Sequence, residues 1–195
     1  MWIAVLLAGG RGSRLGGRHK PGITVAGRTL LDRALAAVAD ADQTVVVGPR
    51  TPTSRPVRWT REQPWGGGPV AALAAGLRED LPEPDEIVLL ATDLAGVTKD
   101  TVDRLRNTLA QQQVDGAVLK DATGRRQWLI SAWRPAPLRA ALPPSPAGAS
   151  LHSVLSTLTV ADVAELPGES IDIDTPADLD KIAPVDGGPS RPSHW

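Results

Sequence analysis

The chain has 195 residues, of which 42% are hydrophobic, so it is long enough for one sizeable core and too short for two ordinary domains. Its 21 basic and 22 acidic residues leave a net charge of −1, which gives no overall field for attracting nucleic acid or an anionic membrane. Cysteine is absent, which excludes disulfides, thiolate metal sites and thiol nucleophiles. The apolar run near the start spans only about seven residues, too few for a signal sequence or membrane span, so we expect a cytoplasmic protein.

Short aliphatic runs alternate with segments of helical period along the first half of the chain. The runs are typical of strands buried on both faces, and they lie at residues 3–8, 44–48, 86–92 and 115–119. The helical segments lie at residues 29–40, 69–79 and 98–112. Thr29 and Thr98 are expected as N-caps, and Pro69 suits a first helical turn. This alternation predicts a single doubly wound α/β domain with a mostly parallel, Rossmann-like sheet.

The second half is less regular. The polar stretch 121–127 (DATGRRQ) separates two apolar runs, which predicts an antiparallel pair attached to the sheet. Residues 135–148 are expected to hold a short helix and a proline-rich loop. From Ala183 the sequence has no periodicity and many Pro, Gly and Ser residues. We therefore expect a folded domain over residues 1–182 and a flexible tail over 183–195.

A loop rich in glycine and cations, LAGGRGSRLGGRHK, follows the first predicted strand at residues 7–20. Glycines let backbone N–H groups approach a phosphate, and Arg and Lys neutralise its charge. Ligands of parallel sheets bind beyond the carboxyl ends of the strands, where this loop lies. It fits neither G-x-G-x-x-G, because Leu15 replaces the third glycine, nor the P-loop, because Arg18 and His19 replace Lys and Ser or Thr. We expect an anion site of another kind, the alternative being a flexible surface turn.

Several segments, taken in order, resemble one family. The motif L-A-G-G-x-x-S-R-x-G-x-x-K resembles the signature of the GT-A-like nucleotidyltransferases, and it is most similar to the molybdenum cofactor guanylyltransferases, the MobA family. The resemblance continues over nearly the whole chain, at residues 21–35, 66–73, 89–97, 126–134 and 172–179. The chain departs from the family pattern at His19, where Asp is usual, and at Leu94-Ala95, where Met-Pro is usual.

The resemblance implies a nucleotide site formed by the opening loop and a second glycine-rich turn. The implied nucleotide-binding residues are Leu7, Ala8, Gly9, Gly10, Arg11, Gly12, Ser13, Lys20, Gly67, Gly68 and Asp93. The implied catalytic residues are Lys20, Arg14 and Asp93, and Lys20, supported by Arg14, would stabilise the triphosphate as pyrophosphate leaves. Trp65, before the second turn, is expected either to stack on a base or pterin ring or to plug a hydrophobic edge.

A magnesium site is expected around Asp93. This residue follows the buried run 86–92, so it emerges at the carboxyl end of a central strand, and Mg²⁺ usually takes one or two carboxylates. Asp172 and Asp174 point to one face of an extended segment. The resemblance implies that one of them is the second ligand, with Asp174 the first choice and Asp172 the next. The alternative role for Asp93 and for Asp174 is capping of the helix that follows each.

The implied reaction is Mg²⁺-dependent transfer of GMP from GTP to the terminal phosphate of molybdopterin, with release of pyrophosphate. GTP and molybdopterin would be the partners, with transient contact to molybdenum cofactor proteins. The turn residues Arg125, Arg126 and Gln127 are expected either to reach the acceptor or to stay inert. One alternative is the same chemistry with CTP or a sugar phosphate. The other is a nucleotide-binding homologue without catalysis, which the departures at His19 and Leu94-Ala95 would suit.

Overall fold

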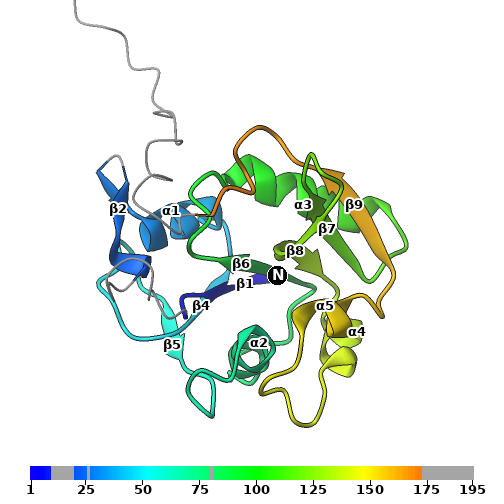
Figure 1. Cartoon of the computed structure of the whole chain (residues 1–195), viewed down its shortest axis with the longest axis horizontal. Coiled ribbons are helices and arrows are strands. Elements are labelled where there is room, and N and C mark those ends of the chain that lie inside the picture. The colour runs from blue at the N-terminus through cyan, green and yellow to red at the C-terminus, as the bar shows by residue number, and fades with distance from the viewer. Residues whose placement is uncertain (10–19, 26, 80, 173–195) are drawn as a thin grey trace, which may run out of the picture.

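A computed structural model describes residues 1–9, 20–25, 27–79 and 81–172 of the chain (Figure 1). Most of the opening loop and the predicted tail 183–195 lie outside these residues, as does Asp174.

The described residues form a seven-stranded sheet in the order β5-β4-β1-β6-β8-β7-β9, in which only β8 runs antiparallel to its neighbours. A separate two-stranded antiparallel sheet joins β2 and β3. The strand bounds are β1 Trp2–Leu7, β2 Thr24–Val25, β3 Arg28–Thr29, β4 Gln43–Val47, β5 Arg58–Thr60, β6 Glu86–Ala91, β7 Gly116–Lys120, β8 Arg126–Trp133 and β9 Val160–Ala164. The predicted α/β class with a mostly parallel sheet is confirmed.

Helices cover both faces of the sheet (Figure 1). The first hydrophobic cluster packs α1 and α3 on one face, and the second packs α2, α4 and α5 on the other. The helix bounds are α1 Leu30–Ala37, α2 Pro69–Leu77, α3 Lys99–Gln111, α4 Pro135–Ala141 and α5 Leu151–Leu155, with a 3₁₀ turn η2 at Lys20–Gly22. Alternate strand residues enter the two clusters, so the central strands are buried on both faces.

Local sequence signals explain where these helices begin. The Thr29 hydroxyl accepts a hydrogen bond from the Asp32 N–H at 3.0 Å, and the Thr98 N–H donates to the Thr101 hydroxyl at 3.1 Å. Pro69 occupies the first turn of α2, as predicted. Helix α2 is buried from Val70 to Leu77 and lies directly on β1 and β4, which explains its apolar sequence.

The β7–β8 hairpin confirms the predicted antiparallel pair, and α4 confirms the short helix. Five of the described strands and helices were not predicted. Strands β5 and β9 lie at the two edges of the sheet, the β2–β3 hairpin is only two residues long on each side, and α5 has five residues. Such short elements bury few side chains, so their hydrophobic pattern is weak.

Candidate functional site

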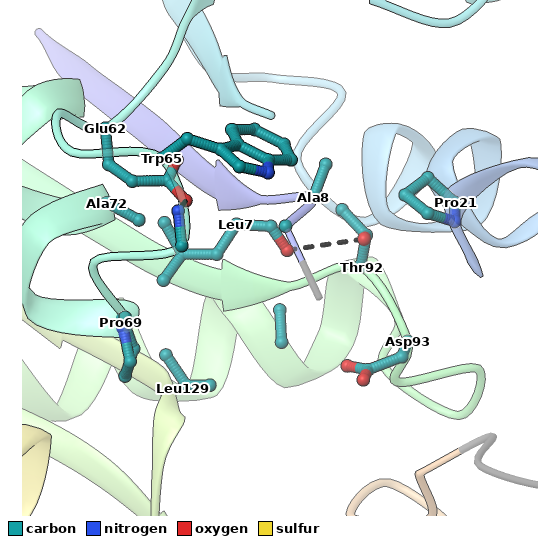
Figure 2. A pocket seen from close by; sticks show the side chains of 14 residues that line it. Leu7, Ala8, Pro21, Glu62, Trp65, Pro69, Ala72, Thr92, Asp93 and Leu129 are labelled. Carbon is teal, nitrogen blue, oxygen red and sulfur yellow. Dashed lines mark hydrogen bonds between the residues drawn. The ribbon is translucent and has the colours of Figure 1, made fainter. Parts of the chain in front are cut away.

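A cavity of about 420 Å³ opens at the carboxyl ends of β1 and β6, beside the start of α2 (Figure 2). Ligands of parallel α/β sheets bind at this edge. The lining residues come from five separate segments of the chain and are Leu7, Ala8, Gly9, Pro21, Glu62, Trp65, Gly66, Gly68, Pro69, Ala72, Ala91, Thr92, Asp93 and Leu129. Five of them, namely Leu7, Ala8, Gly9, Gly68 and Asp93, are among the nucleotide-binding residues that the sequence predicts.

The floor of the cavity is rigid because neighbouring strands hold it. The Leu7 carbonyl accepts from the Thr92 N–H at 3.1 Å and from the Thr92 hydroxyl at 3.3 Å (Figure 2). The Ala8 N–H donates to the Val47 carbonyl at 2.9 Å. A Cβ at Gly48 would lie 2.9 Å from the Ala8 carbonyl, so only glycine allows β4 to pass this closely. The chain thus reaches Gly9 in a fixed position.

Glu62 forms part of the opposite wall, and its position was not predicted from the sequence. The residue is only 7% exposed, although it carries a carboxylate. Its Oε1 accepts from the Gly66 N–H at 3.2 Å, whereas its buried Oε2 has no hydrogen-bond partner among the described residues. Burying a carboxylate oxygen without a donor is costly. Glu62 lines the cavity but its Oε2 is enclosed, so a ligand N–H would pair with this oxygen once the carboxylate turns toward the cavity.

The second glycine-rich turn leads from Glu62 into α2. Gly66 and Gly68 have φ angles of +77° and +92°, which favour glycine, and both line the cavity. Gly67, which was predicted to bind nucleotide, is instead packed between the Ala71 side chain and the Pro64 carbonyl and does not line the cavity. Trp65 is 56% exposed and lies across the cavity in Figure 2, with the Arg61 guanidinium 5.3 Å from its ring centre. Its ring is thus available for stacking and does not plug the core.

Asp93 is half-buried and follows β6 directly, at the edge of the cavity where the sequence places it (Figure 2). Its neighbour Leu94 pairs with Asp172 in an isolated antiparallel bridge, which brings the predicted acidic segment beside Asp93. In the described part of the chain, no group of three or more His, Cys, Asp or Glu residues is arranged to hold a metal. Two carboxylates nevertheless suit Mg²⁺, which takes its other ligands from phosphate and water.

The remaining predicted site residues divide into two groups. Lys20 begins η2, but its side chain is not among those that the structure describes, and Gly10, Arg11, Gly12, Ser13, Arg14 and Asp174 lie outside the described residues. The hairpin residues Arg125, Arg126 and Gln127 do not line the cavity. Arg126 pairs with Asp162 of β9 at 2.6 Å, and Gln127 donates to Asp121 of the hairpin turn at 2.6 Å, so both side chains already have partners within the fold.

The doubly wound sheet with a cavity at its carboxyl edge is the arrangement of α/β proteins whose ligands bind at that edge. The family described as "MobA-like NTP transferase domain" matches residues 4–163, and the chain belongs to this family. None of the described helices is both long enough and apolar enough to span a membrane.

Curated relatives carry one name. The chain is 32% identical over 138 residues to a molybdenum cofactor guanylyltransferase of Rhodopseudomonas palustris, covering 67% of this chain and 65% of that protein. It is 31% identical over 139 residues to the enzyme of the same name from Acidiphilium cryptum, with the same coverage. The aligned part thus spans about 65% of the length of these relatives.

Solved structures support the fold. Molybdopterin-guanine dinucleotide biosynthesis protein A of Archaeoglobus fulgidus has a TM-score of 0.68 at 20% identity, and the match covers 93% of this chain and 96% of that protein's chain. Rv0371c of Mycobacterium tuberculosis has a TM-score of 0.72 at 19% identity, with 92% and 95% covered. A 2-C-methyl-D-erythritol 4-phosphate cytidylyltransferase of Thermus thermophilus has a TM-score of 0.67 at 19% identity, with 91% and 95% covered. At these identities the likeness concerns the fold alone.

Proposed function

We propose that the chain is a Mg²⁺-dependent nucleotidyltransferase that transfers GMP from GTP to molybdopterin. The names of the curated relatives support this reaction. The observation that carries it is the cavity itself, in which the half-buried Asp93 lies at one edge and the spare carboxylate oxygen of Glu62 lies in the opposite wall (Figure 2). One wall suits a cation bound to phosphates, and the other suits a base with N–H donors.

Glu62 favours guanine over the other bases. An ionised carboxylate only accepts hydrogen bonds. The Watson–Crick edge of guanine presents two adjacent donors, N1–H and the N2 amino group, whereas the cytosine edge presents one amino donor beside two acceptors. A carboxylate facing that edge would therefore gain from guanine and be repelled by the acceptors of cytosine. Trp65, exposed across the cavity, can stack on the flat base at the same time.

In the proposed reaction, an oxygen of the terminal phosphate of molybdopterin attacks the α-phosphorus of GTP. The bond from that phosphorus to the bridging oxygen of the β-phosphate breaks, and pyrophosphate leaves with the bonding electrons. The attacking phosphate is already ionised near neutral pH, so no side chain has to act as a general base. A bound Mg²⁺ would offset the negative charge that gathers on the phosphates.

The chain's own residues bind and orient the substrates in this scheme. Asp93, with Asp172 or Asp174 as its partner, would hold the cation, and Lys20, supported by Arg14, would stabilise the departing pyrophosphate. The fixed backbone from Leu7 to Gly9 would set the height of the nucleotide above the sheet edge. GTP and molybdopterin are the small-molecule partners in this proposal, and a cytoplasmic location remains a prediction.

Pyrophosphate release is the direct test. The full chain is incubated with GTP, CTP, ATP or UTP, each with and without Mg²⁺ and molybdopterin. Release that needs GTP, Mg²⁺ and molybdopterin together is the expected result. Release with CTP in place of GTP would keep the reaction class and overturn the proposed base. Tight GTP binding without release under any of these conditions would favour the homologue without catalysis.

A further inference from the structure

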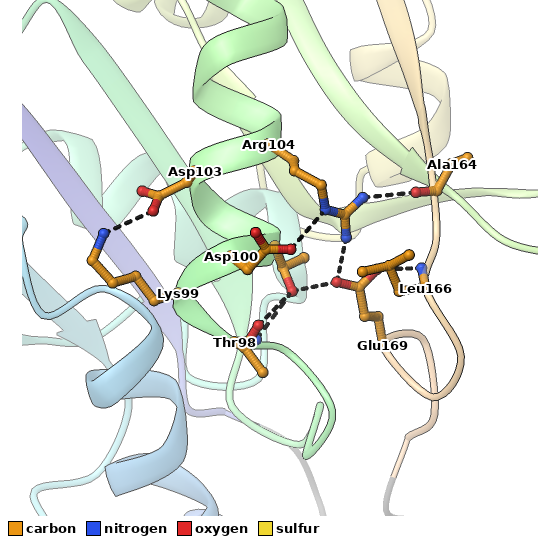
Figure 3. Close-up of polar contacts among 9 residues, drawn as sticks. Thr98, Lys99, Asp100, Asp103, Arg104, Ala164, Leu166 and Glu169 are labelled. Atoms are coloured by element: carbon orange, nitrogen blue, oxygen red, sulfur yellow. Dashed lines mark hydrogen bonds and ion pairs between the residues drawn. The ribbon is translucent and has the colours of Figure 1, made fainter. Parts of the chain in front are cut away.

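A second buried carboxylate, Glu169, lies outside the cavity in the segment that follows β9 (Figure 3). It is only 4% exposed. Its Oε1 accepts from the Thr101 hydroxyl at 2.5 Å and pairs with the Arg104 guanidinium, and its Oε2 accepts from the Leu166 N–H at 2.6 Å. Both oxygens are thus satisfied by donors from α3 and from its own segment.

Arg104 extends this cluster along α3 (Figure 3). It donates to the Ala164 carbonyl at 2.8 Å and pairs with Asp100 at 3.2 Å. Partial burial acts to lower the Arg104 pKa, but the hydrogen bonds and charges of Glu169 and Asp100 together outweigh it and the pKa is raised. The cluster therefore ties residues 164–169 to the first turns of α3.

The same segment also touches the loop between Asp93 and α3. A Cβ added to Gly96 would lie 2.0 Å from the Gly168 carbonyl oxygen, so the two backbones are in direct contact. A few residues further on, Asp172 pairs with Leu94. Two loops that are distant in sequence are thus held together at two places, and each of them carries one of the predicted cation ligands close to the contact.

We propose that Glu169 is a positioning residue for the cation site. Glu169 fastens residues 164–169 to α3. This attachment sets the contact of Gly168 with Gly96 and the pairing of Asp172 with Leu94. Those two contacts in turn set the separation of the Asp93 and Asp172 carboxylates. Glu169 itself touches neither the cavity nor the cation. This inference rests on the proposed function, because it assumes that these carboxylates bind a divalent ion. A buried ionic cluster stabilises a fold weakly compared with apolar packing, but it fixes one arrangement of the groups that it joins.

The test compares Glu169→Gln and Glu169→Ala with Asp103→Asn. The control removes an exposed pair on the same helix, Lys99 to Asp103 at 2.7 Å, which does not touch Glu169 (Figure 3). The probe is Mn²⁺, titrated by electron paramagnetic resonance in the presence of GTP. The Glu169 variants are expected to bind Mn²⁺ about 10- to 100-fold more weakly, the usual effect of losing a residue that orients metal ligands. GTP binding without metal should stay at the parent level, and turnover at saturating metal should largely recover.

Hydrogen exchange of the backbone supplies a readout that needs no ligand. Glu169→Ala should increase exchange at residues 93–97 and 170–172, whereas Asp103→Asn should not. If Glu169→Ala fails to fold, Glu169→Gln, which keeps the side-chain volume, takes its place. Gly96→Ala disturbs the contact between Gly96 and Gly168 from the other loop. Unchanged hydrogen exchange in the Glu169 variants would overturn the positioning role. A variant whose exchange rises while its Mn²⁺ affinity stays at the parent level would overturn it as well. A parent protein that binds no Mn²⁺ with GTP would instead overturn the proposed function, and exchange would still decide whether Glu169 holds the loops.

Discussion

Glu62→Gln is the sharpest test of the proposed base selection. The Oε1 of Glu62 is held by the Gly66 N–H, and the buried Oε2 has no partner among the described residues. In the variant, an amide group that keeps its oxygen toward Gly66 would carry a donor at the position of Oε2 in place of an acceptor. Guanine would then lose at least one hydrogen bond to a charged group. The amide N–H of the new glutamine would also face the N1–H and N2 amino donors of guanine, which it cannot accept.

The magnitude follows from that single contact. A hydrogen bond to a charged group contributes about 1.5–3 kcal/mol, which corresponds to a loss in GTP affinity of about 10- to 150-fold. CTP, whose edge offers acceptors, should bind equally well or better. Calorimetry with GTP, CTP and ITP measures both changes. Because ITP lacks the amino group of guanine, the parent should prefer GTP to ITP, and Glu62→Gln should lose most of that preference.

Glu83→Gln is the matched control, because it makes the same chemical change at an exposed glutamate outside the cavity. It should leave all three affinities unchanged. A GTP-to-ITP ratio that stays the same in Glu62→Gln would refute the reasoning, provided that thermal unfolding shows the variant to be folded. The unpaired oxygen of Glu62 would then have to serve some other group.

Three further predictions concern catalysis, packing and acid stability. Asp93→Ala should reduce Mg²⁺-dependent pyrophosphate release to background, and normal activity would show that the metal assignment is wrong. The free energy of unfolding should change by no more than about 1 kcal/mol, since the side chain is half-buried at a loop. Gly76→Ala should destabilise the fold by about 1–3 kcal/mol in denaturant unfolding, because the new Cβ would lie 2.7 Å from Val5 Cγ1. The Asp121 carboxylate accepts from the Thr123 hydroxyl and from neighbouring N–H groups, which lowers its pKa from 3.8 to about 2. Its contribution to hairpin stability should be complete above pH 3.8 and disappear as the pH falls through about 2, and an NMR titration of Asp121 with its midpoint near 3.8 would contradict this.

The sequence predicted the centre of the fold better than its edges. Strands β1, β4 and β6 are buried on both faces, so each is a continuous aliphatic run that is visible without a structure. The edge strand β9 alternates buried and exposed residues over VADVA, and β5 has only three residues. Their pairing is decided by the neighbouring strand, which no local pattern reveals.

The site was predictable where topology alone determines a residue's place. Asp93 and the backbone at Leu7 to Gly9 end parallel strands, so they meet at one edge whatever the details of packing. Glu62 lies in an irregular stretch between β5 and α2, where no periodicity distinguishes a buried acid from an exposed one. Only its surroundings, a 7% exposed side chain beside a cavity, single it out.

The two buried glutamates differ in whether the fold itself supplies hydrogen-bond donors to both carboxylate oxygens. Glu169 has donors for both oxygens from Thr101, Arg104 and Leu166, so its burial is offset within the fold and its influence on the site is indirect. Among the described residues, Glu62 has a donor for one oxygen only. If folding alone had selected it, a glutamine or an apolar residue would avoid the cost of the unpaired charge. Glu62→Gln should therefore unfold at the same or a higher temperature than the parent while binding GTP more weakly. A less stable variant with normal GTP binding would show instead that Glu62 belongs to the fold and not to the site.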